Sequence, residues 1–484
     1  MHIVCPQCGA TNRVPDASSW VRRTLLAVAL LGAGSAWADP PAAPIDLIAG
    51  WQAAAEHDPQ YAAALAEVHA GQAKARQGDA LWRPNVALTL NGGWAEQRSD
   101  TSGAGFSAPG FGRSTDVAFN TRIDSGTAQG WALTLQQPLY NSARSAGAEQ
   151  LHLQASLADE QLRAAQQALM LRVAQAHFAV LSAREGVKAS QAEQAAAVRA
   201  LGEAKERFAA GAVPVTEVDD AQARHDAVAA QGLAAQDALL QAQADYTALT
   251  GLPAGPLADL PDQAAVSADP GALADWQARA RQQSPQLAQA LIGTQAAQAE
   301  VRRHAASSGV SLDLLARAGG DRISGDGPYA TSGSASYRSG ARWVGLQLTV
   351  PLYTGGLRSA QEDEAAAQLE RSRAQARTAE TELDRLTRAA WLAVNTGSAQ
   401  VRAYEQARAS AAKRLDATRT GLDAGDRTMQ NVLDAERDLH ATELAWQQAR
   451  LNVLLGRLNL AAAAGQLDES TLKRVNEAFS MSKP

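Results

Sequence analysis

FAAGAVPVTEVDDAQAR, at residues 208–224, has a second copy in this chain, GLDAGDRTMQNVLDAER, at residues 421–437. In each copy a helix-forming run ends at a glycine, a short polar turn follows, and a second helical run begins. Glycine allows the positive φ that ends many helices, and Thr216 or Asp426 is expected to cap the helix that follows. Each copy therefore predicts the tip of a helical hairpin. The matched residues lie 214 positions apart: Gly211 and Gly425, Val218 and Val432, Asp220 and Asp434, Ala221 and Ala435.

The first half of the chain changes between helical and strand patterns. The long helix among them would reach roughly 100 Å, and the two shorter ones together match its length. We expect these two to lie end to end along its flank. In order, the patterns predict a helix over 46–82 that Pro59 interrupts, a strand over 86–94, a polar loop over 97–127, a second strand that stops at Pro138, and helices over 142–209 and 215–250.

The second half repeats this order. Strand patterns at 310–314 and 344–350 flank a Gly- and Ser-rich loop over 321–340, and a long helix and a half-length helix follow to about residue 464. The chain is therefore an internal tandem repeat. We divide it into a leader (1–38), a first structural repeat (39–251), a linker (252–271), a second structural repeat (272–465) and a C-terminal tail (466–484).

The leader carries a secretory signal at residues 20–38, with two arginines, a short apolar run and a small-residue cleavage site. Cleavage after Ala38 would leave a mature chain without cysteine. Before the signal, Cys5 and Cys8 have the spacing of zinc ligands and resemble half of a zinc ribbon. A structural zinc site needs four ligands, and the chain has no second cysteine pair, so we expect no metal site there.

Composition narrows the class of function. The net charge of −6 gives no support for nucleic-acid binding. Neither tip is accompanied by a nucleophile, a phosphate-binding loop or a cluster of metal ligands, so the sequence predicts neither an enzyme nor a cofactor. The apolar run of the signal is too short to span a bilayer as a helix and no other run reaches its length, so any insertion into a membrane must use strands.

Four strands of about ten residues match the thickness of an outer membrane. Four strands cannot close a barrel alone, and open sheet edges are not tolerated in lipid, so closure requires several chains. The competing interpretation is a secreted periplasmic coiled-coil scaffold or adaptor without a barrel, in which the strands form soluble hairpins packed on helices. The signal sequence and the Trp residues near the strand ends favour the membrane.

PLYN at 138–141, PLYTGG at 351–356 and the run GxxxxxxVLDAERxL at 425–439 resemble the TolC family of outer-membrane export channels. The resemblance implies a homotrimer with a twelve-stranded barrel, four strands from each chain, continued by a long periplasmic helical barrel. It also implies a passive duct that works with a periplasmic adaptor and an inner-membrane transporter. The mature start without cysteine resembles the non-lipidated, type I secretion branch. Whether the cargo is protein, drug or metal ion stays open.

The same resemblance assigns roles to residues at the tips. It implies a periplasmic gate in which Arg427 binds the pair Thr216 and Glu217, where relatives often have Asp at the second position. It implies an acidic constriction ring at two positions that carry Asp434 and Asn431 here, so one of the two carboxylates is missing. A Tyr common in the family is replaced by Leu422. The tips themselves, at Gly211 and Gly425, are expected to meet the adaptor.

Overall fold

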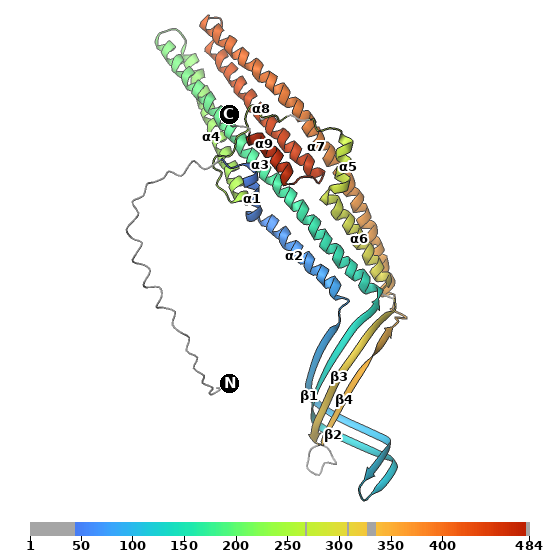
Figure 1. Cartoon of the computed structure of the whole chain (residues 1–484). Helices are drawn as coiled ribbons and strands as arrows, with labels where there is room; N and C mark the ends of the chain where they lie inside the picture. Colours follow the sequence, from blue (N-terminus) through green and yellow to red (C-terminus); the bar gives the residue numbers. More distant parts are fainter. Residues whose placement is uncertain (1–43, 267–268, 307–308, 327–334, 481–484) are drawn as a thin grey trace, which may run out of the picture. The chain divides into compact units, whose positions relative to one another are not determined.

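A computed structural model describes residues 44–266, 269–306, 309–326 and 335–480. Its helices and strands follow the order predicted from the sequence (Figure 1). The leader, with its signal sequence, Cys5 and Cys8, lies outside the described residues. The elements are α1 (Leu47–His57), α2 (Pro59–Ala80), β1 (Asn85–Ala108), β2 (Gly112–Asn141), α3 (Ser142–Ala209), α4 (Val215–Thr250), α5 (Leu273–Gln283), α6 (Pro285–Ala306), β3 (Ser311–Asp326), β4 (Ala335–Thr349), α7 (Leu357–Asp423), α8 (Met429–Ala463) and α9 (Glu469–Ser480).

Local signals in the sequence set the helix ends. Asp58 ends α1 and caps α2 by accepting a hydrogen bond from the backbone NH of Tyr61 at 3.0 Å, and Pro59 takes the first helical position, where its missing NH costs nothing. Asp58 also forms an ion pair with Arg172 of α3 at 2.6 Å, and this contact lowers the pKa of its carboxyl group. The break that Pro59 predicts is therefore confirmed.

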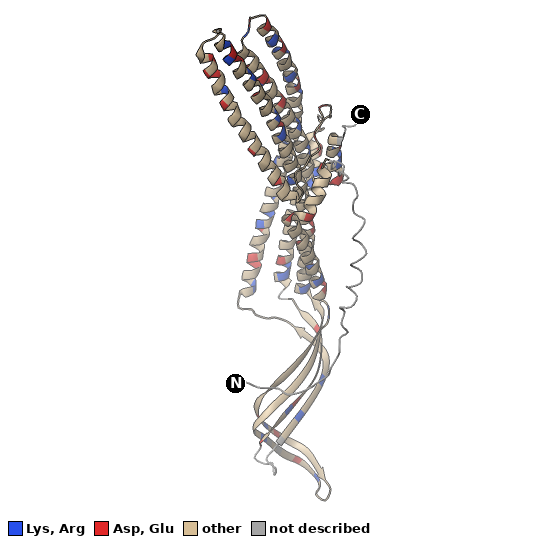
Figure 2. Cartoon of the chain, turned by 90° about the vertical axis from the view of Figure 1, so that its left-hand side faces the viewer, with Lys and Arg blue, Asp and Glu red and all other residues tan. Residues whose placement is uncertain are grey.

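The two long helices organise the packing of their own repeats. α2 and α4 both contact α3, and α1 contacts α4, as the length argument predicts for the first repeat. α5, α6 and α8 contact α7 in the same way, and contacts of α3 with α6 and α8 join the two repeats. Figure 2 shows charges of both signs along the helices, whereas the strands carry few.

The four strands form one antiparallel sheet in the order β1-β2-β3-β4. Direct pairs place large apolar side chains on one face, because Leu88 lies opposite Leu133 and Leu314 lies opposite Leu346. The other face carries polar side chains such as Thr134. Many residues of the apolar face are exposed in the single chain: Val86, Leu88, Leu90, Trp131, Leu133, Val344, Leu346 and Leu348.

The loops predicted between the strands are the main error of the sequence analysis. Residues 97–108 and 112–127 are strand, not loop, and only the turn at 109–111 separates β1 from β2. Gly, Ser and Thr suit a turn, but cross-strand pairing outweighs a β-propensity scale that spans only about 1 kcal/mol. The 321–340 loop is likewise strand where described, because β3 continues to Asp326 and β4 begins at Ala335. The strands are thus longer than ten residues.

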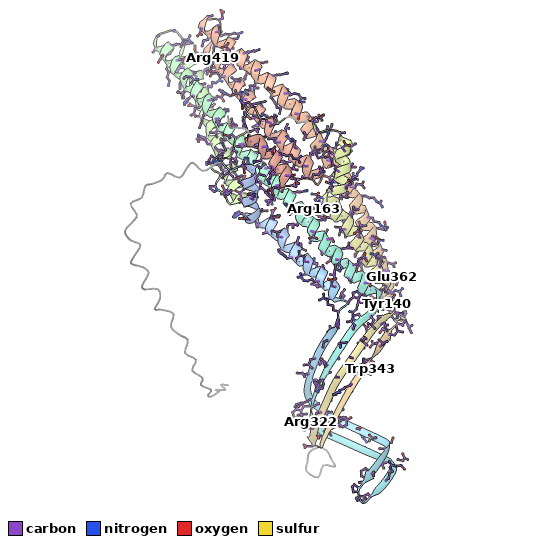
Figure 3. The ribbon with its side chains drawn as sticks, viewed as in Figure 1. Tyr140, Arg163, Arg322, Trp343, Glu362 and Arg419 are labelled. Carbon is purple, nitrogen blue, oxygen red and sulfur yellow. The ribbon has the colours of Figure 1, made fainter. Side chains whose placement is uncertain are left out.

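Pro138 does not end β2 as predicted. The strand passes through it to Asn141, with a register shift against β3 between Pro138 and Tyr140 that accommodates the missing NH. Asn141 then accepts a hydrogen bond from the backbone NH of Arg144 at 3.0 Å and so caps α3. Figure 3 labels Tyr140 at this change from strand to helix and Trp343 on β4.

The main core lies between the middle of α3 and the end of α8. The C-terminal tail forms α9, whose Leu472, Val475 and Phe479 are buried in that core. The residues between α4 and α5 are irregular, and Arg450 of α8 holds them by donating hydrogen bonds to the carbonyls of Pro261 and Ala264. None of the helices in the described part of the chain combines the length and apolar character that crossing a membrane requires.

Candidate functional site at the hairpin tips

Both tips are glycine turns, as the repeat predicts. Gly211 has φ +73° and Gly425 has φ +81°, and a Cβ at either position would meet no atom within 4 Å. The glycines are therefore required by the left-handed backbone and not by crowding. Backbone hydrogen bonds close each turn, from the NH of Ala212 to the carbonyl of Arg207 at 2.8 Å and from Asp426 to Gly421 at 2.9 Å.

The helices that leave the tips are capped differently from the prediction. α8 has a full capping box, in which Thr428 and Asn431 each bind the backbone NH of the other. α4 has no side-chain cap, because the cap position holds Pro214. Thr216 and Asp426 are not caps, since each lies two positions away from the residue that takes that place.

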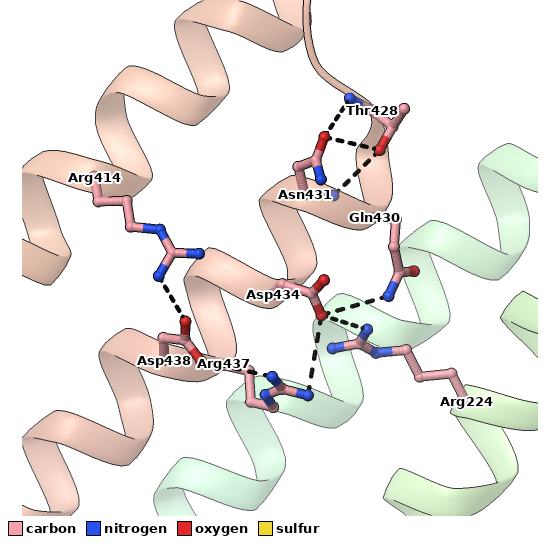
Figure 4. A network of polar contacts seen from close by, with 8 residues as sticks. All are labelled: Arg224, Arg414, Thr428, Gln430, Asn431, Asp434, Arg437 and Asp438. Carbon is pink, nitrogen blue, oxygen red and sulfur yellow. Dashed lines mark hydrogen bonds and ion pairs between the residues drawn. The ribbon is translucent and has the colours of Figure 1, made fainter.

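Asp434 joins the two hairpins (Figure 4). Its carboxylate accepts a hydrogen bond from Arg224 of α4 at 3.0 Å, which is also an ion pair, and one from Gln430 at 3.4 Å. The guanidinium of Arg437 lies 4.0 Å away on the same helix. The Arg224 side chain is 19% exposed and that of Asp434 is 35% exposed, so the pair is partly shielded from water.

The predicted gate pair does not form within the chain. Glu217 forms an ion pair with Arg207 of its own hairpin at 3.5 Å, and both side chains are well exposed. Arg427 is exposed, its methylenes lie beside Gly421, and it forms no ion pair among the described residues. Thr216 is exposed on the first turn of α4.

The predicted ring positions differ in their contacts. Asn431 uses its side-chain oxygen in the capping box, so this position contributes neither a carboxylate nor a free acceptor. Asp434 contributes a carboxylate that Arg224 already neutralises. Leu422 packs against the small apolar cluster of Leu415, Val432 and Ala435 within the second hairpin.

Other ion pairs hold α7 and α8 together. Glu436 contacts Arg419 of α7 at 2.7 Å and Arg199 of α3 at 4.0 Å, and Asp438 contacts Arg414 at 2.7 Å. Figure 3 labels Arg419 close to the second tip. Sequence reasoning missed Arg224, although one signal was present. The repeat matches Arg224 with Asp438, so the two copies carry opposite charges at the same position.

A cavity of about 760 Å³ lies between α3, α4 and the start of α8. Charged side chains line much of it, including Arg207, Asp220 and Arg224. The apolar contact between the hairpins here is small, formed by Ala196, Ala200 and Leu433 with Met429 against them. The hairpins are thus joined near their tips by the ion pair of Arg224 with Asp434, the longer contact of Arg199 with Glu436 and a few apolar atoms. Nowhere in the described residues do three or more possible metal ligands cluster.

Known proteins share this architecture and much of this sequence. The outer membrane efflux protein family matches residues 51–252 and 276–466. Outer membrane protein TolC of Vibrio cholerae is 32% identical over 352 residues, which cover 72% of this chain and 80% of that protein. Alkaline protease secretion protein AprF of Pseudomonas aeruginosa is 27% identical over 440 residues, covering 90% and 87%. The crystal structure of VceC from Vibrio cholerae has a TM-score of 0.67 at 18% identity, covering 87% and 97%.

These likenesses confirm the predicted fold class, in which a tandem repeat supplies four strands to an outer-membrane barrel and long helices to its periplasmic extension. They also confirm the predicted export-channel function and the outer-membrane location, and they do not favour a scaffold or adaptor without a barrel. The family is one of transport channels. The chain belongs to the outer membrane efflux protein family.

Proposed function

We propose that the chain forms a homotrimeric exit duct of a tripartite export system and that its periplasmic end opens by separation of the two hairpin tips. The observation that carries the proposal is the sheet, which is open at both edges and exposes a continuous apolar face. Among the described residues, β1 has a partner only on the β2 side and β4 only on the β3 side. Such edges are stable in lipid only when another chain pairs with them.

Three chains with four strands each give the twelve-stranded barrel that the resemblance implies. Pairing of β1 in one chain with β4 in the next would remove every edge. The apolar face, on which Leu90 is 72% exposed and Leu348 is 63% exposed, would then contact outer-membrane lipid. The polar face, with Thr134 and Asp321, would line the lumen.

The tip contacts suit a gate because they are few. We propose that the ion pair of Arg224 with Asp434 is the latch between the hairpins of one chain. Arg427 is exposed at the second tip, next to Gly421, and could reach a polar or acidic partner in the next subunit, where Glu217 and Thr216 remain candidates. In this proposal Arg427, Glu217 and Thr216 remain gate residues. Asp434 becomes part of the latch, together with Arg224.

Partners and cargo follow from the relatives. AprF is an alkaline protease secretion protein and covers most of this chain, so we propose protein export through a type I system. A periplasmic adaptor would contact the tips at Gly211 and Gly425 and connect the duct to an inner-membrane transporter. Exposed glycine turns without neighbouring side chains leave the backbone accessible to such a partner.

The test uses the full-length protein purified from outer membranes in detergent. We expect a trimer on gels that dissociates only on heating, and discrete conductance steps when it is inserted in planar bilayers. Deleting β4, from Ala335 to Thr349, removes one edge partner and should abolish both. A monomer without conductance from the parent protein would contradict the proposal.

A further inference from the structure

The first two strands extend well beyond the other two. Pairing of β2 with β3 ends at Ser125 and Asp326, whereas β1 and β2 remain paired from Gln97 and Ile123 to Ala108 and Gly112. Figure 1 shows the two strands continuing past the ends of β3 and β4. We call residues 97–123 the overhang. It is a two-stranded hairpin of about 12 residues per strand, and at about 3.3 Å per residue it is roughly 40 Å long.

The overhang leaves the sheet through a packed bend. The register of β1 against β2 shifts between Ala95 and Gln97, which marks a bulge, and bulges bend strands. At this bend Ile123 is only 1% exposed, although the surrounding strands expose most of their side chains. A Cβ on Gly126 would lie 3.0 Å from the Ile123 side chain. The bend is therefore a packed structure around one buried side chain.

Glycine contacts show the direction of the bend. A Cβ on Gly325 would point out of one face of the sheet and would clash there with the backbone of Ser125 and Gly126. At this point β2 therefore leaves the plane of the sheet and passes over that face of β3. β3 pairs without a register shift from Asp313 to Gly325, so Gly325 shares its face with Arg317 and Asp321. This is the polar face of the sheet. The overhang therefore bends toward the lumen and away from the lipid.

We propose that the overhang is a lid, and that three overhangs cover the extracellular mouth of the barrel by contacting one another. The proposal rests on the proposed trimeric barrel. Twelve tilted strands at about 4.8 Å spacing enclose a radius of roughly 12 Å, so a hairpin of about 40 Å is long enough for its turn to lie at the axis from any side. At its turn Phe111 is 85% exposed in the single chain. Contact with the neighbouring overhangs would bury this ring.

Access to the lumen from outside the cell tests the lid. Thr134→Cys places one thiol on the polar face, in a background with Cys5→Ser and Cys8→Ser that is otherwise free of cysteine. Whole cells are treated with a small maleimide or with a polyethylene-glycol maleimide that fits through the open barrel but is too large to pass between the lids. Small maleimide should label every variant, whereas a lid that is open in a tenth of molecules or fewer slows the large reagent roughly tenfold or more.

Two changes should remove this protection by different routes. Replacing residues 99–121 with Asn-Gly joins Arg98 to Arg122, which are paired opposite each other, and shortens the lid while keeping the bend. Gly325→Ala keeps the lid but forces the bend to open. Gly93→Ala is the matched control, because its Cβ would meet no atom within 4 Å. Only the first two should restore fast labelling by the large reagent.

A second measurement tests contact between the lids. Phe111→Cys should give disulfide-linked subunits on mild oxidation, since the three turns would meet near the axis. Equal labelling of the parent and the shortened variant by the large reagent, without such links, would overturn the lid. The failure of the trimeric channel is a separate result, because it would appear as loss of the heat-sensitive trimer and of bilayer conductance in the same preparations.

Discussion

Arg224→Gln should open the periplasmic end of the channel. The change removes the charge that binds Asp434 at 3.0 Å and leaves a shorter, uncharged polar side chain. An exposed ion pair contributes about 0–1 kcal/mol, and hydrogen bonds to charged groups contribute about 1.5–3 kcal/mol. Because the Asp434 side chain is 35% exposed, we take about 1 kcal/mol for each latch.

The symmetry of the trimer multiplies this small energy. Three latches that open together contribute about 3 kcal/mol, and each 1.4 kcal/mol changes an equilibrium tenfold. The ratio of open to closed channels should therefore rise by roughly a hundredfold in Arg224→Gln. Single-channel recording in planar bilayers measures this ratio directly, as the fraction of time that each channel spends in its high-conductance state.

A double-mutant cycle identifies the partner. If Arg224 acts on Asp434, then Asp434→Asn opens the channel as much as Arg224→Gln, and the double variant opens no further. Arg419→Gln is the matched control, since its ion pair with Glu436 joins α7 and α8 of one hairpin. The latch would be refuted if Arg224→Gln channels opened no more often than the parent. It would also be refuted if the effects of the two single changes simply added in the double variant.

Three further outcomes are expected. Arg427→Ala should also raise conductance, with trimer stability unchanged on gels, if its partner lies in the next subunit. Cysteines at Ala212 and Asp426 should crosslink to a periplasmic adaptor in intact cells, and capture only through the strand end would contradict docking at the tips. Burial lowers the pKa of His177 to about 4. The contribution of the neutral ring to the free energy of unfolding is therefore fully present above pH 6.5 and is lost as the pH falls toward 4. The loss is about 3 kcal/mol; thermal unfolding of His177→Leu should lack this pH dependence.

Local signals explain which elements could be predicted. Pro59 interrupts a helix, and Gly211 and Gly425 end helices. Between such points the apolar residues recur at helical spacing, which predicts the helices. The end of the chain also carried a signal, because Leu472, Val475 and Phe479 recur at helical spacing. This apolar stripe indicates that the C-terminal tail forms a packed helix.

Features that depend on a distant partner could not be predicted in this way. Residues 97–108 have the composition of a loop and form a strand only because residues 112–123 pair with them. The contact of Arg224 with Asp434 depends on how α4 and α8 are rotated toward each other, which no local spacing encodes. Within one chain Glu217 contacts Arg207 instead of Arg427, so the pairing of Glu217 with Arg427 stays a prediction for the assembled channel.

Packing along the helices explains why opening can be confined to the tips. Leu169 and Val173 of α3 and Leu454 and Leu458 of α8 are fully buried in the main core. Each such side chain contributes about 1.5–3 kcal/mol, so the middle of the hairpins costs far more to separate than the latch. Near the tips a polar cavity replaces this packing. A partner that supplies a few kcal/mol at the tips can therefore part the hairpins there while the core keeps the rest of the helices in place.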